Sequence, residues 1–280
     1  MKSVSAANRG AAYITGGSSG IGFAFAAELL RSATPVVLIA RNPERLERAR
    51  DSLSKVANAG LIHGEVGDVS DYISLKGAFD RAAGRAGPPR LLLHTAGIAE
   101  PDYFEALTQE RYRRQLEINL TGSWNALQLG VAAMRSHKER PCHILTVSSL
   151  AGIIPVFGYT AYGATKFGVC GLSLALRQEL YREGIYVSVL APGDMDTPGL
   201  LAESATKPPE TRALAGNKPL DPGGVARYAL KKLYQRKQVI VPSLKNRLEL
   251  FVYRVAPGLG ERIMLHMTKG VSRGRKIHSQ

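Results

Sequence analysis

The sequence predicts an α/β fold in which a doubly wound parallel sheet of about seven strands carries helices on both faces. Three observations predict it. The chain has 280 residues, of which 45% are hydrophobic, so it can bury a sizeable core. Short apolar runs alternate with longer amphipathic stretches, which is the pattern of repeated βαβ units. No Pro/Gly/Ser-rich linker or charge block divides residues 10–241, so we expect one domain over residues 1–241 and an extension over residues 242–280.

The alternation places the elements in order along the chain. The apolar runs predict strands at Ala11–Thr15, Val36–Ala40, Leu61–Val66, Leu91–Thr95, Ile144–Ser148, Tyr186–Leu190 and Val239–Val241. The amphipathic stretches predict helices at about 20–32, 43–57, 70–85, 108–136, 160–183 and 222–235. The sequence has no internal repeat, which excludes solenoids and propellers. Its two cysteines, Cys142 and Cys170, form no C-x-x-C motif, so we expect reduced thiols and neither a disulfide framework nor a zinc site.

Turns of small residues lie at the carboxyl ends of four expected strands. Right-handed crossovers bring these ends to one edge of the sheet, where ligands bind in open α/β folds. The turns are Gly16–Gly22 after the first strand, His94–Gly97 after the fourth, Ser148-Ser149 after the fifth and Pro192-Gly193 after the sixth. The sequence therefore predicts a ligand site at this edge.

The first of these turns has the character of a dinucleotide-binding loop. Gly16, Gly20 and Gly22 follow a strand and open a helix, where a pyrophosphate can approach backbone N–H groups and the positive end of the helix dipole. Their spacing, G-x-x-x-G-x-G, differs from the usual fingerprint, so the turn alone is equally consistent with a mere tight turn.

The end of the second expected strand bears on the choice of cofactor. It reads Ile39-Ala40-Arg41-Asn42 and has no acid that would bind the ribose hydroxyls of NADH. Arg41 can clamp a 2′-phosphate, which favours NADPH; the alternative is a solvated residue at a helix start.

One group of polar residues fits carbonyl reduction. Tyr162 and Lys166 are four residues apart, so they share one face of a helix, although such a pair alone is usually surface decoration. Ser149 ends the fifth strand, and Asn119 lies within the long helix after the fourth. Carbonyl reduction needs a proton donor, a charge that tunes it, and a donor that polarises the carbonyl. A nearby ammonium favours the phenolate of a tyrosine, whose ordinary pKa is about 10.

Together these motifs resemble the short-chain dehydrogenase/reductase family, whose fold is Rossmann-type. The resemblance covers about residues 10–241 and rests on Thr15–Gly22, Asn119, Ser149, Tyr162 with Lys166, and Pro192-Gly193 followed by Thr197. It implies that Tyr162 is the general acid/base and that Lys166 lowers its pKa and holds the nicotinamide ribose. It further implies that Ser149 orients the substrate oxygen and that Asn119 supports a water-linked proton path.

The resemblance also implies a binding site for NADPH/NADP+. Asp68-Val69 resembles the pair that contacts the adenine, and Thr197 the contact to the carboxamide. With Arg41, the expected cofactor-binding residues are Gly16, Ser18, Ser19, Gly20, Ile21, Gly22, Arg41, Asp68, Val69, Ala96, Gly97, Tyr162, Lys166, Pro192, Gly193 and Thr197. No metal is expected.

The sequence departs from the family pattern after the fourth strand, where Asn-Asn-Ala-Gly is usual and His94-Thr95-Ala96-Gly97 stands here. We expect Thr95 to replace an amide in bracing the sheet edge. We expect His94 to be a core or edge histidine rather than a new catalytic group. Ala96 and Gly97 keep the close approach of a cofactor possible.

Substrate specificity is expected in the segment after the sixth strand, as a long irregular loop. Residues 196–199 and 206–212, with residues 37–42 and 157–162, resemble 3-ketodihydrosphingosine reductases. The resemblance implies reduction of the 3-keto group of a long-chain sphingoid base. Leu200, Leu201 and Leu214 could line a passage for the chain, or simply belong to the lid. The alternatives are another hydrophobic ketone, such as a 3-ketoacyl thioester or a steroid, and a non-catalytic cofactor-binding scaffold.

The extension over residues 242–280 is basic and amphipathic. The chain has a net charge of +14, and this extension has eight Lys/Arg against two acids. Leu244, Leu248, Phe251, Val252 and Val255 fall at helical spacing, as do Ile263, Met264 and Met267 after Pro257-Gly258. This spacing predicts two short helices that lie in a membrane interface and are attracted by anionic lipid. Alternatively, these helices cover the main domain or a partner subunit and end in a solvated basic segment.

The remaining expectations concern location and partners. Residues 1–9 have no apolar segment of the kind that a signal peptide needs, and no apolar run is long enough to span a membrane. We therefore expect a cytoplasmic protein, peripheral at most on the cytoplasmic face of a membrane. Nucleic acid is not expected as a partner, because the basic extension has no recognised motif for binding nucleic acid. The resemblance suggests a homo-oligomer formed through the long helices.

Overall fold

The structure is a computed structural model that describes residues 10–137, 139–215 and 218–272. Seven parallel strands form one sheet in the order β3-β2-β1-β4-β5-β6-β7, which confirms the doubly wound fold. The strands are β1 (Ala11–Thr15), β2 (Val36–Ala40), β3 (Ile62–Val66), β4 (Pro89–His94), β5 (Cys142–Val147), β6 (Ile185–Leu190) and β7 (Val239–Ile240). From β1 the chain adds β2 and β3 on one side of β1, and then β4 to β7 on its other side. The switch point of the topology therefore lies between β1 and β4, which is where open α/β folds bind ligands.

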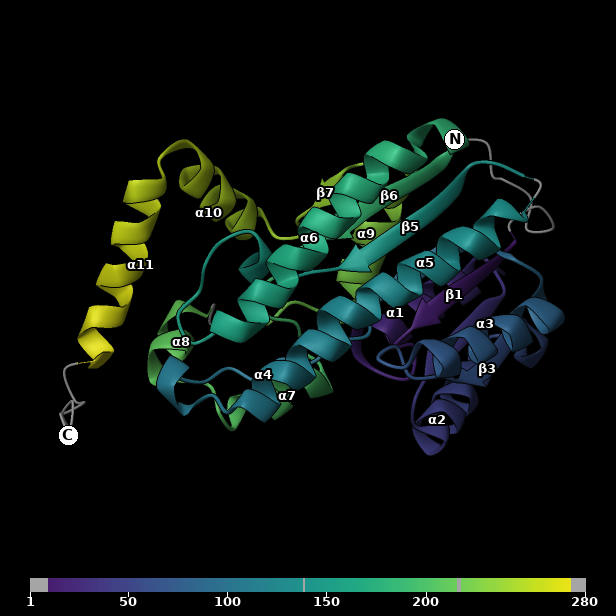
Figure 1. The fold of residues 1–280 in the computed structure, drawn as a ribbon, viewed down its shortest axis with the longest axis horizontal. Helices are drawn as coiled ribbons and strands as arrows, with labels where there is room; N and C mark the ends of the chain where they lie inside the picture. The colour runs from purple at the N-terminus through teal and green to yellow at the C-terminus, as the bar shows by residue number, and fades with distance from the viewer. Residues whose placement is uncertain (1–9, 138, 216–217, 273–280) are drawn as a thin grey trace.

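Helices cover both faces of the sheet (Figure 1). The helices of the main domain are α1 (Gly20–Arg31), α2 (Pro43–Ser54), α3 (Tyr72–Ala86), α4 (Gln109–Gln115), α5 (Gly122–Arg135), α6 (Thr160–Leu180) and α9 (Pro222–Tyr234). One core joins the sheet to α1, α2 and α9, and the other joins it to α3, α5 and α6. Successive residues of β1 alternate between them: Ala12 and Ile14 belong to the first core, and Ala11 and Tyr13 to the second.

Element boundaries differ from the prediction by a few residues where local hydrogen bonds decide them. The helix expected from residue 70 begins at Tyr72, because the carboxylate of Asp71 accepts hydrogen bonds from the backbone N–H groups of Ile73 and Ser74. β3 begins one residue late, because Ala59–Leu61 form a 3-10 turn. The long helix expected at 108–136 is α4 and α5 joined by a π-helical turn at Leu116–Thr121.

The segment after β6 is not the irregular loop that we expected. It contains two short helices, α7 (Pro198–Ser204) and α8 (Pro209–Leu214). Each begins with proline, whose fixed φ suits the first helical position, and the hydroxyl of Thr197 accepts a hydrogen bond from Leu200 N–H at the start of α7. Residues 194–215, which include both helices, are called the lid below.

The extension forms two helices, α10 (Leu244–Val255) and α11 (Pro257–Ser272), as expected. α11 packs against α8, so the extension lies over the lid (Figure 1). Leu250 points inward and is buried, whereas Leu244, Phe251 and Val255 are exposed. The helices thus cover part of the main domain and also present an apolar outer face. The expected solvated basic end and residues 1–9 lie outside the described residues.

Candidate active site

The glycine turn between β1 and α1 brings the backbone close to the neighbouring strand end. Gly16 and Gly20 have φ of 72° and 55°, values that favour glycine. A Cβ at Gly22 would lie 2.5 Å from the carbonyl oxygen of Gly16 and from Thr95 Oγ1. The turn, with Ser18 and Ser19, therefore leaves bare backbone at the N-terminus of a twelve-residue helix, which suits a pyrophosphate.

The residues expected at the adenosine end lie farther along the same edge. Arg41 follows β2 directly and is exposed. Gly67 N–H donates to the carbonyl oxygen of Ala40, which sets the start of the β3 turn beside Arg41. Asp68 Oδ1 accepts from the N–H and hydroxyl of Ser70, and Val69 is buried. Arg41, Asp68 and Val69 are thus neighbours in the fold but lie outside the main cavity described below.

His94 belongs to a buried chain of hydrogen bonds. Ser123 Oγ donates to the carbonyl oxygen of Asn119 at 2.5 Å, so it accepts from His94 Nε2, 2.9 Å away. His94 Nδ1 then accepts from Thr15 Oγ1, at 2.7 Å. Burial lowers the pKa of His94 to about 3, and the Lys166 charge adds to this effect, so the imidazole is neutral. His94 is a core residue, as expected, that links β1 and β4 to the π-helical turn.

Thr95 and Gly97 complete the turn after β4. Thr95 Oγ1 donates to the carbonyl oxygen of Thr15 at 2.7 Å and so braces the two strand ends, as expected. Ala96 lies against Gly16, since a Cβ at Gly16 would come within 2.8 Å of Ala96 N. A Cβ at Gly97 would lie 3.1 Å from both Asn119 Oδ1 and Lys166 Nζ. The backbone of this turn therefore lies so close to its neighbours that only small side chains fit there.

Asn119 is held by three hydrogen bonds. Its Oδ1 accepts from Ile98 N–H at 2.8 Å, and its Nδ2 donates to the Ile98 carbonyl oxygen at 2.8 Å and to Thr165 Oγ1 at 3.1 Å. Asn119 lies in the π-helical turn, a local irregularity common at functional sites. It is fully buried and fixes the loop after β4 against α6.

Ser149, Tyr162 and Lys166 lie together in one cavity. Lys166 is buried, its Nζ donates to the Val147 carbonyl oxygen at 3.1 Å, and it lies 5.6 Å from the centre of the Tyr162 ring. Burial lowers the pKa of Lys166 to about 8. Burial raises the pKa of Tyr162, the Glu203 and Asp194 charges add to this, and a hydrogen bond with Ser149 lowers it. At neutral pH Tyr162 is therefore a protonated phenol that can act as a proton donor.

The cavity has a volume of about 770 Å³, in the range of small-molecule sites. Of the expected residues, it is lined by Ile21, Gly97, Ser149, Tyr162, Lys166, Pro192, Gly193 and Thr197. Its far wall comes from the lid and the extension, including Leu200, Leu214, Val252, Met264 and Met267. A Cβ at Gly193 would lie 2.9 Å from Asn246 Oδ1, so α10 reaches the turn after β6.

Four further polar residues line this cavity and were not expected from the sequence: Tyr159 at the start of α6, and Asp194, Glu203 and Lys207 of the lid. Tyr159 OH donates to Glu203 Oε2 at 2.6 Å, and Lys207 Nζ lies 2.9 Å from Asp194 Oδ2. Tyr159 is buried, which raises its pKa. The four-residue spacing of Glu203 and Lys207 was the available signal, but such pairs are common on helix surfaces. Within the described residues, no three His, Cys, Asp or Glu side chains gather in a way that could hold a metal.

Comparison with known proteins defines the class. The profile of the family described as short chain dehydrogenase matches residues 10–208. The chain belongs to the short-chain dehydrogenase family, as the motifs predicted.

Curated relatives share much of the sequence. The chain is 37% identical over 206 residues to the 3-dehydrosphinganine reductase TSC10B of Arabidopsis thaliana, covering 73% of this chain and 61% of that protein. It is 34% identical over 226 residues to the 3-ketodihydrosphingosine reductase of Mus musculus, covering 79% and 68%. The chain thus spans about three-fifths of the length of the first of these relatives.

Solved structures share the fold. The apo form of LigD from Sphingobium sp. strain SYK-6 has a TM-score of 0.75 at 28% identity and covers 88% of this chain and 95% of that one. A short-chain dehydrogenase from Novosphingobium aromaticivorans has a TM-score of 0.77 at 22% identity and covers 94% and 96%.

Proposed function

We propose that this chain is an NADPH-dependent reductase of a lipidic ketone, which reduces 3-ketodihydrosphingosine to dihydrosphingosine with Tyr162 as the general acid. The observation that carries the proposal is the single cavity in which Ser149, Tyr162 and Lys166 face the apolar side chains of the lid and the extension. Curated relatives named for this reaction support the choice of substrate.

The residues of the sheet edge fit a dinucleotide. The bare backbone at Gly16 and Gly22 would cradle the pyrophosphate at the start of α1, and Gly97 leaves space next to Lys166. Arg41 would bind the 2′-phosphate, with Asp68 and Val69 at the adenine and Pro192, Gly193 and Thr197 at the nicotinamide. When bound, NADPH supplies a hydride to the keto carbon.

The chain's own residues would manage the proton. Tyr162 donates its phenolic proton to the oxygen of the ketone as charge develops there. The Ser149 hydroxyl orients the same oxygen by a hydrogen bond. The Lys166 ammonium, 5.6 Å from the Tyr162 ring, favours the phenolate that remains after transfer. Asn119 keeps the loop after β4 in place, and its link to Thr165 connects that loop to the helix that carries Tyr162 and Lys166.

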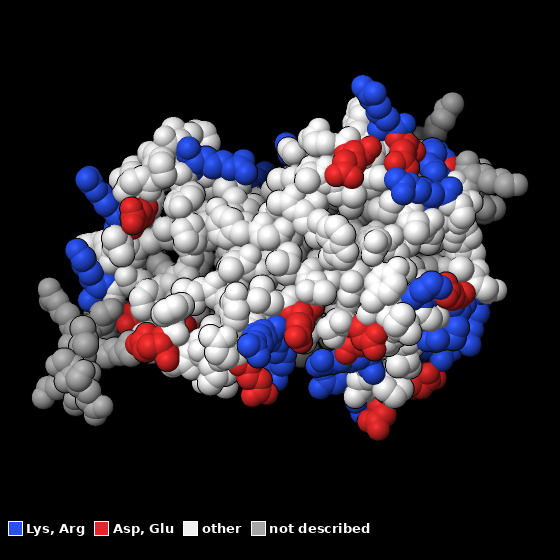
Figure 2. Space-filling model, viewed as in Figure 1, with Lys and Arg blue, Asp and Glu red and all other residues white. Residues whose placement is uncertain are grey.

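The extension supports peripheral contact with a membrane. Leu244, Leu248, Phe251 and Val255 form an exposed apolar stripe on α10, between 62% and 75% exposed. Figure 2 shows Lys and Arg side chains projecting from the extension beside uncharged surface, with acidic surface among them. The extension has eight Lys/Arg against two acids, a balance suited to anionic lipid. Leu248 also lines the cavity, so the stripe reaches its mouth. Within the described residues, no helix has the length and hydropathy needed to cross a membrane.

The homo-oligomer stays a prediction. Exposed aromatic side chains on the long helices support it: Trp124 on α5 is 56% exposed and Phe167 on α6 is 43% exposed. The division into residues 1–241 and 242–280 likewise stays a prediction, and it falls at the end of β7.

The test is the oxidation of NADPH with 3-ketodihydrosphingosine in liposomes, compared with a short soluble ketone, a 3-ketoacyl thioester and a steroid ketone. We expect turnover of the sphingoid ketone and a fall of about 100- to 10,000-fold in kcat for Tyr162→Phe, because general acid catalysis contributes about that much. NADPH binding to this variant, followed by fluorescence, should be unchanged. Turnover of another ketone alone would replace the substrate, and NADPH binding without any turnover would favour a scaffold.

A further inference from the structure

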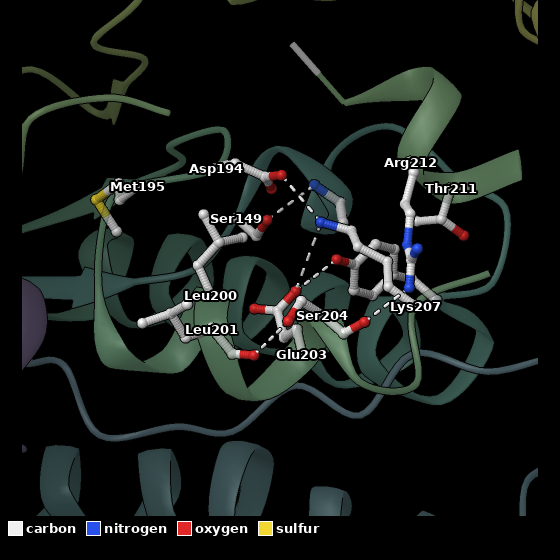
Figure 3. Close-up of polar contacts among 12 residues, drawn as sticks. Ser149, Asp194, Met195, Leu200, Leu201, Glu203, Ser204, Lys207, Thr211 and Arg212 are labelled. Atoms are coloured by element: carbon white, nitrogen blue, oxygen red, sulfur yellow. Dashed lines mark hydrogen bonds and ion pairs between the residues drawn. The ribbon is translucent and has the colours of Figure 1, made fainter. Parts of the chain in front are cut away.

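A charged cluster occupies the lid side of the cavity. Asp194 follows β6, Glu203 is on α7 and Lys207 lies between α7 and α8. Lys207 Nζ is 2.9 Å from Asp194 Oδ2 and 3.8 Å from Glu203 Oε2, which also accepts the Tyr159 hydroxyl at 2.6 Å. Figure 3 shows the two carboxylates converging on the Lys207 ammonium, with Ser149 close by. We call Asp194, Glu203, Lys207 and Tyr159 the lid cluster.

The lid cluster belongs to the cavity that holds the reaction centre. All four residues line it, together with Ser149 and Tyr162. The rings of Tyr159 and Tyr162 have centres 5.2 Å apart, and Tyr159 is hydrogen-bonded to Glu203. Only the Tyr159 side chain therefore connects Glu203 to the proposed acid, Tyr162. A substrate whose carbonyl oxygen reaches Tyr162 therefore places the atoms adjacent to its carbonyl next to the lid cluster.

The carboxylates of the lid cluster have capacity for another donor. One lysine serves two carboxylates, and its distance to Glu203 exceeds that of a hydrogen bond. The contacts that the structure shows for Glu203 all fall on Oε2, whereas an ionised carboxylate accepts about four hydrogen bonds. The Glu203 side chain retains 17% exposure and that of Asp194 34%, both within the lining of the cavity. Lys166, which also lines the cavity, already donates to the Val147 carbonyl oxygen.

We propose that Glu203, assisted by Asp194, binds an ammonium group on the carbon next to the substrate carbonyl, so that the lid selects α-amino ketones. This inference rests on the proposed reduction, whose sphingoid ketone carries such an amino group. An ammonium has three N–H donors, which suits the carboxylate oxygens of the lid cluster. Charged residues outside the lid cluster, among them Glu100, Arg114 and Lys245, also line the cavity, but the lid cluster is the group whose Tyr159 ring lies 5.2 Å from the ring of Tyr162.

Binding of the ammonium would also act on the proposed acid. The charges of Glu203 and Asp194 raise the pKa of Tyr162. A cation that neutralises them removes this effect and makes proton transfer from the phenol easier. An amino ketone would then gain in both binding and turnover over the same ketone without nitrogen.

The experiment compares 3-ketodihydrosphingosine with the same ketone carrying hydrogen in place of the amino group. We expect the wild-type protein to prefer the amino ketone in kcat/KM. Glu203→Gln keeps an acceptor for the Tyr159 hydroxyl but removes the charge, so KM for the amino ketone should rise about 10- to 100-fold. KM for the nitrogen-free ketone should change by less than about twofold, because a neutral substrate makes no ionic contact with Glu203. Its kcat should rise, because loss of the Glu203 charge removes one cause of the raised pKa of Tyr162.

Asp196→Asn is the matched control, because it removes the same charge from an exposed lid residue outside the cavity lining. Asp196→Asn should leave KM for both substrates unchanged. An equal rise in KM for both substrates in Glu203→Gln would overturn the inference and leave the proposed reductase function intact. A wild-type protein that does not discriminate between the ketones would also overturn it, without relying on any variant. A protein that reduces neither ketone would instead refute the proposed function itself.

Discussion

The neutral state of His94 makes stability depend on pH, and the sign follows from linkage. Its pKa is about 3 in the fold and about 6.5 in an unfolded chain, so between these values the unfolded state binds more protons. Stability contributed by the neutral imidazole is therefore complete above about pH 6.5 and is lost as pH falls toward 3. Because one pKa unit corresponds to 1.36 kcal/mol, acidification from about pH 7 to about pH 5 should cost about 2 kcal/mol from this residue.

The perturbation is His94→Asn, which restores the residue usual in the family. Asparagine does not titrate, and it cannot span from Thr15 Oγ1 to Ser123 Oγ as the imidazole does. We expect the variant to be less stable near pH 7, because each lost buried hydrogen bond costs about 1 kcal/mol. Between about pH 7 and about pH 5, however, it should lose about 2 kcal/mol less than wild type.

Urea unfolding followed by circular dichroism measures both quantities. Other titrating groups, including His143 with its pKa of about 4, are shared by the two proteins and cancel in the difference. An identical change in unfolding free energy with pH for both proteins would refute the buried neutral imidazole.

Two other predictions follow from exposed residues. Arg41→Ala should raise the Kd for NADPH by about tenfold or more and leave that for NADH nearly unchanged, because a charge-assisted contact to the 2′-phosphate is lost; titration by fluorescence measures both, and equal effects would contradict the role of Arg41. The double variant Phe251→Ser, Val255→Ser should bind vesicles containing phosphatidylserine about tenfold more weakly in sedimentation, because both side chains are exposed on the apolar stripe of α10 and outside the cavity lining. Retained NADPH oxidation with a soluble ketone is the control, and unchanged sedimentation would argue against the stripe as the membrane contact.

Local patterns were sufficient to predict the sheet and the position of the proposed catalytic residues. Strand ends follow from runs of apolar residues, and parallel topology then places Gly16, Ser149 and Gly193 at one edge. The spacing of Tyr162 and Lys166 sets both on one helix face, and the structure puts both in the cavity.

The lid could not be predicted to the same extent. Its helices are too short for a periodic signal, and the capping by Thr197 and the prolines decided them. The ionic contacts of Lys207 join residues on separate segments, which no local pattern encodes. The sequence also gives no sign that Glu203 is enclosed, since its burial depends on Tyr159, over forty residues away. Burial in turn raises the pKa of Glu203, a consequence that only the folded arrangement produces.

The extension was ambiguous for a physical reason that the structure makes clear. An amphipathic helix next to a domain can bury its apolar side chains against protein or lipid, and hydrophobic periodicity does not distinguish the two. α10 both packs against the domain and presents an apolar outer face, because Leu250 is buried while Phe251 is exposed. Leu248 is 63% exposed and also lines the cavity, so the outer stripe and the cavity meet at this residue. If the stripe rests on lipid as proposed, a long-chain ketone reaches Tyr162 with its chain still in apolar surroundings, and only the polar end must leave the interface. The lid cluster is where that polar end would be received, so the extension and the lid serve opposite ends of the same substrate.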